Sequence, residues 1–269
     1  MKNKRYTLYA FLAVVVLGGL CWVVLRGPTK PPEPVYQGKR LSEWLDVLGA
    51  LPHSNAERAS REAAATALRQ MGTNAIPSLL WMARARDSEL RRRFIDLAGK
   101  QKLVKIKMQE AEQWNMQALR GFRVLGPVAS NAVPALIELA GRGTSPRPRL
   151  HAIDDLTTIH ARPDLVVPAL TRLLNDSDAR ARAEAVYALG QWGEDAKPVI
   201  PALIRVLAQD ADRNVRRMTI VTLEKIGGGN AEVAGALKAA ANDQDPVVRT
   251  EAQRVVQTDQ GAPAQPVVK

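Results

Sequence analysis

The chain has 269 residues, of which 46% are hydrophobic and only 4% aromatic, and its formal net charge is +11. An interior built mostly from alanine, leucine, valine and isoleucine favours closely packed helices over a β-sandwich, which is rich in aromatic and β-branched residues. The one cysteine, Cys21, excludes a disulfide framework, and the rest of the chain can form neither a thiolate metal site nor a cysteine nucleophile.

The N-terminus has the pattern of a membrane anchor. Residues 1–5 form a basic flank, and the segment 6–26 is free of charge up to Arg26. An apolar helix of about 20 residues spans the hydrocarbon core of a bilayer, and a basic flank stays on its cytoplasmic side. We therefore expect a transmembrane signal-anchor helix over 6–26, a cytoplasmic N-terminus and an extracytoplasmic C-terminal part, which is periplasmic in a Gram-negative cell.

A cleaved signal peptide is the alternative interpretation of this segment. Its apolar region is usually about 7–15 residues long and ends in small residues before the cleavage site. Here the apolar run continues through 22–25 and has no Ala-x-Ala pattern. The sequence favours a retained anchor and leaves cleavage open.

Residues 27–40 are predicted to be a linker. The segment contains Pro28, Pro31, Pro32 and Pro34. Proline-rich segments adopt the extended polyproline II conformation, which rises about 3.1 Å per residue. We expect a semi-rigid spacer that separates the bilayer from the folded part of the chain.

Sequence features recur with a period of 33 or 34 residues over 41–257. An apolar-Pro-Ala-Leu motif places Pro134, Pro168 and Pro201 at this spacing, and Gly193 and Gly227 are 34 residues apart. Such self-similarity is typical of stacked repeats. A column of arginines has the same period, and each is preceded four residues earlier by a short polar side chain: Arg149, Arg182, Arg216 and Arg249 follow Ser145, Asp178, Asp212 and Asp245.

Each period predicts a helical hairpin, with a short first helix, a turn that contains Asp or Asn, and a longer second helix that ends at glycine. Short polar side chains cap the second helix, and one hairpin cannot bury both of its apolar faces, so neighbours must stack. The second unit is about 20 residues longer than the period, which marks an insertion at about 84–109. The predicted units are 41–72, 73–126, 127–160, 161–193, 194–227 and 228–257, followed by a disordered tail over 258–269.

These residues resemble the HEAT repeat family. The resemblance covers about 41–257, and the segment 36–45 is similar to the opening of uncharacterised bacterial HEAT proteins that follow a membrane segment. It implies an all-α fold, an α-solenoid of about six HEAT-like helical hairpins preceded by one transmembrane helix, and a protein-binding role with no named partner. It also implies a structural ladder between adjacent repeats, made by Asp178, Arg182, Asp212, Arg216, Asp245 and Arg249.

The sequence predicts no catalytic, cofactor or metal site. It has no glycine-rich phosphate loop, serine nucleophile elbow or paired-histidine zinc motif. None of His53, His151 and His160 is followed by Glu, as in the iron-binding HEAT-like hydroxylases. We expect a protein that is not an enzyme and has no small-molecule substrate. HEAT-like DNA-base excision enzymes and bilin lyases are less favoured alternatives, because an exported anchor suits neither.

The arginine column invites a nucleic-acid interpretation, which needs a continuous basic stripe. The neighbouring second-helix positions include acids such as Glu184 and Glu251, so no such stripe is expected. We predict instead that a protein or peptide binds the concave face formed by the second helices, where scattered anchors give specificity. The candidate partner-binding residues are Arg120, Tyr187, Met218 and Arg254.

The insertion offers an alternative function. Residues 84–107 hold nine cations and three acids, interleaved with apolar residues. A basic amphipathic helix binds anionic lipid or an acidic partner, whereas the simpler interpretation is a solvated helix that lengthens one hairpin. The candidate basic surface consists of Arg91, Arg92, Arg93, Lys100 and Lys102.

Overall fold

The computed structural model describes residues 30–87, 93, 111–141 and 146–259. The predicted anchor, most of the insertion and residues 260–269 of the predicted tail lie outside the described residues, whereas 258 and 259 belong to the last helix. The fold begins with a small antiparallel pair of strands, β1 (Val35–Tyr36) and β2 (Lys39–Arg40). Every longer element that follows is a helix.

The described helices form consecutive antiparallel hairpins, which confirms the predicted all-α solenoid. Short 3₁₀ helices η1 (Gly72–Ala75), η2 (Gly126–Ala132) and η3 (Gly193–Val199) lead into three of the first helices. The hairpins are α2 (Leu41–Gly49) with α3 (Asn55–Met71), α4 (Ile76–Ala83) with α6 (Ala111–Leu125), α7 (Val133–Ala140) with α8 (Pro146–Ile159), α9 (Pro163–Leu173) with α10 (Ala179–Gln191), α11 (Ile200–Gln209) with α12 (Arg213–Ile226), and α13 (Ala231–Ala240) with α14 (Pro246–Asp259).

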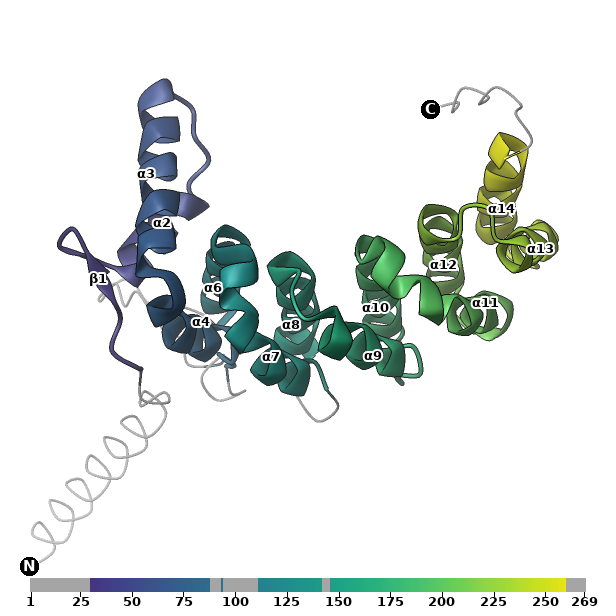
Figure 1. Cartoon of the computed structure of the whole chain (residues 1–269), viewed down its shortest axis with the longest axis horizontal. Coiled ribbons are helices and arrows are strands. Elements are labelled where there is room, and N and C mark those ends of the chain that lie inside the picture. Colours follow the sequence, from purple (N-terminus) through teal and green to yellow (C-terminus); the bar gives the residue numbers. More distant parts are fainter. Residues whose placement is uncertain (1–29, 88–92, 94–110, 142–145, 260–269) are drawn as a thin grey trace, which may run out of the picture.

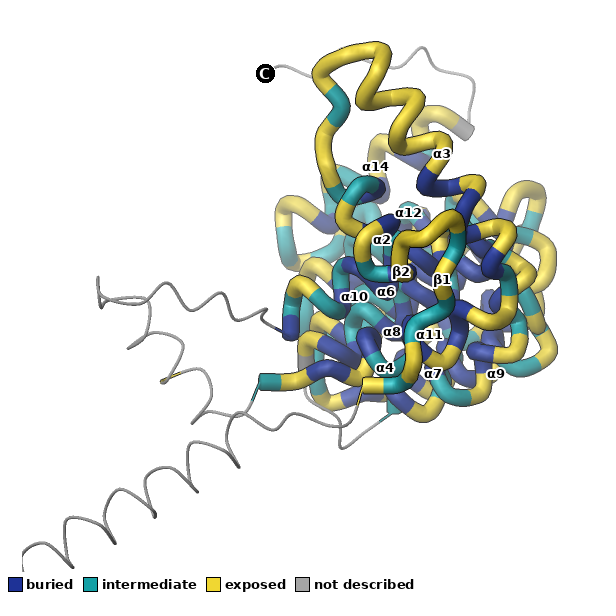
Figure 2. The backbone as a smooth tube through the Cα atoms, turned by 90° about the vertical axis from the view of Figure 1, so that its left-hand side faces the viewer, coloured by how far each residue is buried: buried dark blue, intermediate teal, exposed yellow. Residues whose placement is uncertain are grey.

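The hairpins stack side by side into an arc. Figure 1 shows the first helices α4, α7, α9 and α11 along the outer side and the second helices α6, α8, α10 and α12 along the inner side. Viewed along the stack, the buried residues lie in the middle and the exposed ones around them (Figure 2). One apolar core therefore runs through the whole arc, from Leu41 in α2 to Val255 in α14.

Backbone conformation explains why the second helices end where they do. Gly72, Gly126 and Gly193 have φ values of 54°, 52° and 53°, a region that side chains with a Cβ rarely adopt. At the corresponding point of the third hairpin the chain has His160, with φ 47°. The His160 ring stacks on Trp192 with 4.4 Å between centroids, so this contact with the next hairpin supports a strained residue.

Residues 30–40, most of the predicted linker 27–40, pack against the folded part, which differs from the expected spacer. The Leu41 N–H donates to the Pro34 carbonyl at 3.0 Å, and the Trp44 indole N–H donates to the Tyr36 carbonyl at 3.2 Å. Ser78, which is far away in the sequence, donates to the Pro32 carbonyl at 3.5 Å. Contacts with distant residues thus hold 30–40 against the first two hairpins.

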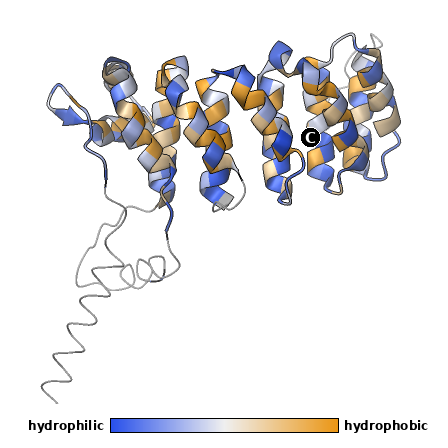
Figure 3. Cartoon of the chain, turned by 60° about the horizontal axis from the view of Figure 1, so that its bottom comes forward, coloured by the Kyte–Doolittle hydropathy of each residue, from blue (hydrophilic) through white to orange (hydrophobic). Residues whose placement is uncertain are grey.

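None of the described helices combines the length and the hydrophobicity that a membrane span needs. Hydrophilic and hydrophobic residues alternate over these helices, as Figure 3 shows. The predicted anchor at 6–26 lies outside the described residues, so it stays a prediction.

Candidate functional site

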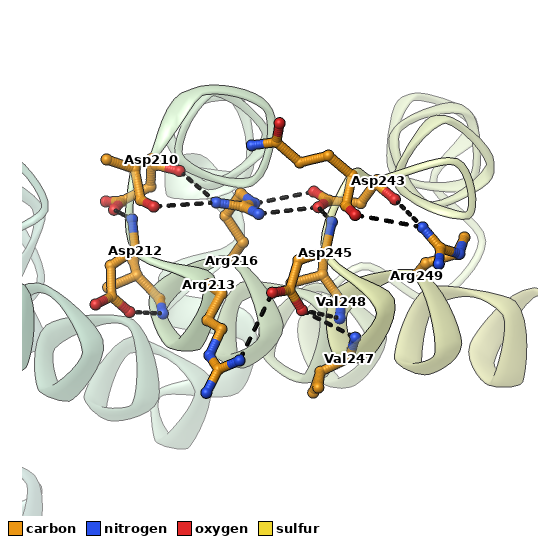
Figure 4. A network of polar contacts seen from close by, with 12 residues as sticks. Asp210, Asp212, Arg213, Arg216, Asp243, Asp245, Val247, Val248 and Arg249 are labelled. Atoms are coloured by element: carbon orange, nitrogen blue, oxygen red, sulfur yellow. Dashed lines mark hydrogen bonds and ion pairs between the residues drawn. The ribbon is translucent and has the colours of Figure 1, made fainter.

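The most regular polar feature is a ladder of arginines and aspartates at the turns between first and second helices (Figure 4). Arg216 donates from Nε and Nη2 to the two carboxylate oxygens of Asp243 in the next hairpin, both at 2.9 Å. Its Nη1 donates to the Asp210 carbonyl of its own hairpin at 2.8 Å. The two-pronged geometry of an arginine–carboxylate pair fixes the position of both partners. Each such rung therefore fastens one hairpin to the next.

The rungs before it repeat this arrangement. Arg182 donates to both carboxylate oxygens of Asp210 at 2.7 Å and to the Asp176 carbonyl at 2.8 Å. Arg149 pairs with the Asp176 carboxylate and donates from Nε to the Ala140 carbonyl at 2.9 Å. Three successive junctions are thus each held by an arginine–aspartate pair, of which those of Arg182 and Arg216 are two-pronged.

The acidic members of the ladder differ from the predicted ones. Asp176, Asp210 and Asp243 receive the arginines, whereas Asp178 and its counterparts cap the second helices. The aspartates predicted as rungs accept backbone N–H groups: Asp178 from Arg180 at 2.9 Å, Asp212 from Asn214 at 2.7 Å and Asp245 from Val247 at 2.9 Å. Asp245 also forms an ion pair with Arg213 of the preceding hairpin, at 3.8 Å.

The sequence does contain a pattern that marks the aspartates that pair with the ladder arginines. The pattern Asp-x-Asp recurs as 176–178, 210–212 and 243–245, with the same period as the arginines. In each case the first aspartate also accepts the N–H of the second, at 2.8 or 2.9 Å. The first carboxylate thus lies at the turn, within reach of the preceding hairpin.

The ladder weakens at both of its ends. Arg249 donates to the carbonyls of Asp243 at 2.6 Å and Gln244 at 3.5 Å, and no acid among the described residues pairs with it. In the second hairpin Asn115 takes the place of arginine and donates to three carbonyls near the end of α4. In the first hairpin the corresponding residue is Arg61, which is exposed.

Electrostatics explain why the ladder arginines are poor candidates for binding a phosphate backbone. Burial by itself raises the pKa of Asp210, but the hydrogen bonds from Arg182 and from the Asp212 N–H hold this pKa below its usual value. The hydrogen bonds from Arg216 likewise lower the pKa of Asp243. The carboxylates are therefore ionised at neutral pH, and they already use the donors that a phosphate would need.

The four candidate partner-binding residues are placed on four different second helices. Tyr187 on α10 is 45% exposed. Met218 on α12 is partly buried and packs against the core. Arg254 on α14 pairs with Glu224 and Glu251, at 2.8 Å each. The guanidinium of Arg120 on α6 lies against Gly49, where an added Cβ would come within 2.4 Å of Nη1. Of these four, Tyr187 is the one that offers exposed apolar surface.

Titratable side chains gather between α8 and α10. Burial, together with a hydrogen bond to Asp154, raises the pKa of Glu184 to about 7. The neighbouring Asp155 is fully buried, and neither of its carboxylate oxygens has a hydrogen-bond partner in the described part of the chain. Its pKa is raised well above the usual range, mainly by burial. The sequence did not predict that Asp154 and Glu184 meet, because the two carboxyl groups come from different hairpins.

No group of three or more His, Cys, Asp or Glu side chains within the described ranges could hold a metal ion. The Nε2 of His151 lies 3.3 Å from a carboxylate oxygen of Glu112 in α6. Arg147 approaches the other oxygen of Glu112 at 3.3 Å.

Shallow grooves follow the junctions between hairpins. One of about 440 Å³ lies between the fourth and fifth hairpins and includes Asp176, Arg182 and Asp210 in its lining. Another of about 380 Å³ lies between the third and fourth and also includes Asp176. Ladder residues thus line both grooves, and we attribute the grooves to the stacking of neighbouring hairpins.

Of the candidate basic surface, Arg93 is exposed, and Arg91, Arg92, Lys100 and Lys102 lie outside the described residues.

Comparisons with known proteins agree with this geometry. A family model for HEAT repeats matches residues 133–206 and 195–257. No curated protein matches the chain. The crystal structure of an engineered protein is 18% identical and is matched over 82% of this chain and 96% of that one, at a TM-score of 0.41, which is too low to carry an argument. The repeat period and the ladder agree with the family model, which shows that residues 133–257 consist of HEAT repeats.

Proposed function

We propose that this protein is a non-catalytic, membrane-tethered scaffold that binds a protein or peptide on the inner face of its solenoid. The observation that carries the proposal is the exposed Tyr187 of α10. Figure 1 shows α10 in the middle of the row of second helices. Aromatic side chains are frequent anchors of protein interfaces because they bury a large area at little entropic cost. The HEAT repeat solenoid is typically an interaction scaffold.

The ladder supports this proposal indirectly. Because the rungs fasten hairpin to hairpin, the second helices form a pre-organised surface. A rigid surface loses little conformational entropy when a partner binds. The proposed tether is the apolar segment 6–26, which would place the solenoid outside the cytoplasm.

Site-specific photocrosslinking in the native membrane tests the binding face. A photoreactive phenylalanine analogue at Tyr187 is expected to give discrete protein adducts. The matched control is the same analogue at Arg205, an exposed residue of α11 on the outer row. Adducts of equal yield from both positions, or adducts from Arg205 alone, would rule out the inner face as the binding surface.

The membrane tether has a separate test. Full-length protein is expected to remain in the membrane fraction after a carbonate wash and to be sensitive to protease added from the extracytoplasmic side. A protein of reduced size in the soluble fraction would show that the N-terminal segment is cleaved.

A further inference from the structure

Residues 30–34, which we call the strap, lie docked on the first two hairpins. The Lys30 ammonium lies 4.7 Å from the ring centroid of Trp114 and 5.9 Å from that of Trp81. The two indoles meet edge to face, with centroids 5.2 Å apart and an angle of 77° between their planes. A cation over an aromatic face is attracted by the ring quadrupole. Lys30 is therefore held by residues from α4 and α6.

Hydrogen bonds and an ion pair fix the rest of the strap. Glu33 pairs with Lys30 and accepts the Ser42 N–H at 2.8 Å, and its side chain is only 6% exposed. Burial opposes ionisation of Glu33, but Lys30 and Ser42 together lower its pKa below the usual value. The carbonyls of Pro32 and Pro34 accept from Ser78 and Leu41. The strap is thus attached along its whole length.

The attachment shortens the free connection to the predicted anchor. The predicted anchor ends at Arg26, and the strap begins at Lys30. A fully extended chain covers at most about 3.6 Å per residue, so the four steps between them span no more than about 14 Å. This is much shorter than the linker expected from the proline content, and it restricts how the solenoid can turn relative to the membrane.

Cationic side chains lie at the same edge of the solenoid. Arg84 and Arg86 are exposed and lie just after the end of α4, three and five residues after Trp81. Neither arginine forms an ion pair with another described residue. Unpaired cations close to a bilayer are attracted to anionic headgroups.

We propose that the strap holds the solenoid against the bilayer in a fixed orientation, with the edge that carries Trp81, Arg84 and Arg86 on anionic headgroups. The inference rests on the membrane tether of the proposed function. It assigns to the strap a positioning role and to this edge a lipid partner. The binding face of the second helices then has a defined direction relative to the membrane.

Energy transfer from the protein to labelled lipid headgroups tests the orientation. The full-length chain with Cys21→Ala is placed in vesicles of phosphatidylcholine and phosphatidylserine. A donor is attached through Gln113→Cys, next to Trp114, or through the matched Gln257→Cys near the end of α14; both glutamines are exposed. Transfer is expected to be several-fold more efficient from position 113. Equal transfer from the two positions overturns the inference.

Two further sets of measurements test the strap and the cationic edge separately. The double change Lys30→Ala and Glu33→Ala should bring the two positions to similar transfer while the helical content by circular dichroism stays unchanged. Replacing phosphatidylserine with phosphatidylcholine, or changing Arg84 and Arg86 to Gln, should lower transfer from position 113. Unchanged transfer in these arms counts against the inference.

Flotation of the vesicles distinguishes the two proposals. A chain that does not float with the vesicles overturns the tether and, with it, the inference. A chain that floats but shows equal transfer from both positions leaves the tether standing and overturns only the fixed orientation.

Discussion

Arg216 and Asp243 join two consecutive hairpins through a pair of hydrogen bonds of 2.9 Å each. Both side chains are largely buried, at 6% and 12% exposure. The carbonyl of Asp210 takes a further donor of the same guanidinium, so Arg216 links both turns. Loss of this side chain therefore leaves a carboxylate without its counterion at a junction between repeats.

We expect Arg216→Met to destabilise the protein by about 3 kcal/mol, because breaking a buried pair leaves an uncompensated charge. The measurement is urea denaturation followed by circular dichroism. Arg249→Met is the matched control: Arg249 has carbonyl partners but no paired acid among the described residues, so its loss should cost clearly less. Equal losses for the two variants would contradict the role given to the rung.

The two aspartates of one turn should respond differently to the change from Asp to Asn. Asp210→Asn removes the charge that receives Arg182, whereas Asp212→Asn keeps a good capping side chain. We expect the thermal midpoint to fall substantially for Asp210→Asn and little for Asp212→Asn. A larger fall for Asp212→Asn would restore the assignment expected from the sequence.

Glu184 makes stability depend on pH in a predictable direction. Its pKa is about 7 in the folded protein and near 4.5 in an unfolded chain. Between these values the folded state binds more protons than the unfolded state, so the free energy of unfolding falls as the pH rises from 4.5 to 7. Glu184→Gln should flatten this slope and stabilise the protein at pH 8. The slope should persist in Glu232→Gln, which changes an exposed glutamate of α13.

Two glycine-to-alanine changes should have opposite signs. Gly72 has φ 54° and ψ −133°, a conformation in which a Cβ is strained, so Gly72→Ala should cost about 1–3 kcal/mol. Gly235 lies inside α13 with nothing within 4 Å of an added Cβ, and Gly235→Ala should stabilise by about 0.5–1 kcal/mol. Thermal unfolding of the two variants checks the prediction, and a stabilising Gly72→Ala would contradict it.

The periodic columns in the sequence predicted the helical hairpins and their stacking, because each column marks the same structural position in every repeat. They did not identify which aspartate meets each arginine. Asp176 and Asp178 both have counterparts at the same period in the following hairpins, so spacing alone does not tell which of the two side chains faces the preceding hairpin. The direction of the side chains at the turn decides this.

Features that depend on distant residues were predicted less well. Local composition suggested a spacer at 27–40, but Trp81 and Trp114 hold Lys30 from far along the chain. Arg254 was a candidate for partner binding, yet it pairs with Glu224 of the preceding hairpin. A side chain that lies on the expected face can still be occupied by a neighbour, which a single sequence does not reveal.

The ladder also gives the solenoid a direction of growth. Every rung reaches forward, from an arginine of one hairpin to an aspartate of the following one, as Arg182 does to Asp210. Within the described part of the chain, Arg249 is an arginine that has reached the end of the series. An added hairpin with an aspartate equivalent to Asp243 would meet a ready counterion there. Toward the N-terminus, the second hairpin has Asn115 in place of the arginine, so the series of arginine–aspartate pairs begins after it. The ladder therefore has a polarity, because each guanidinium points toward the C-terminal neighbour and each receiving carboxylate toward the N-terminal one.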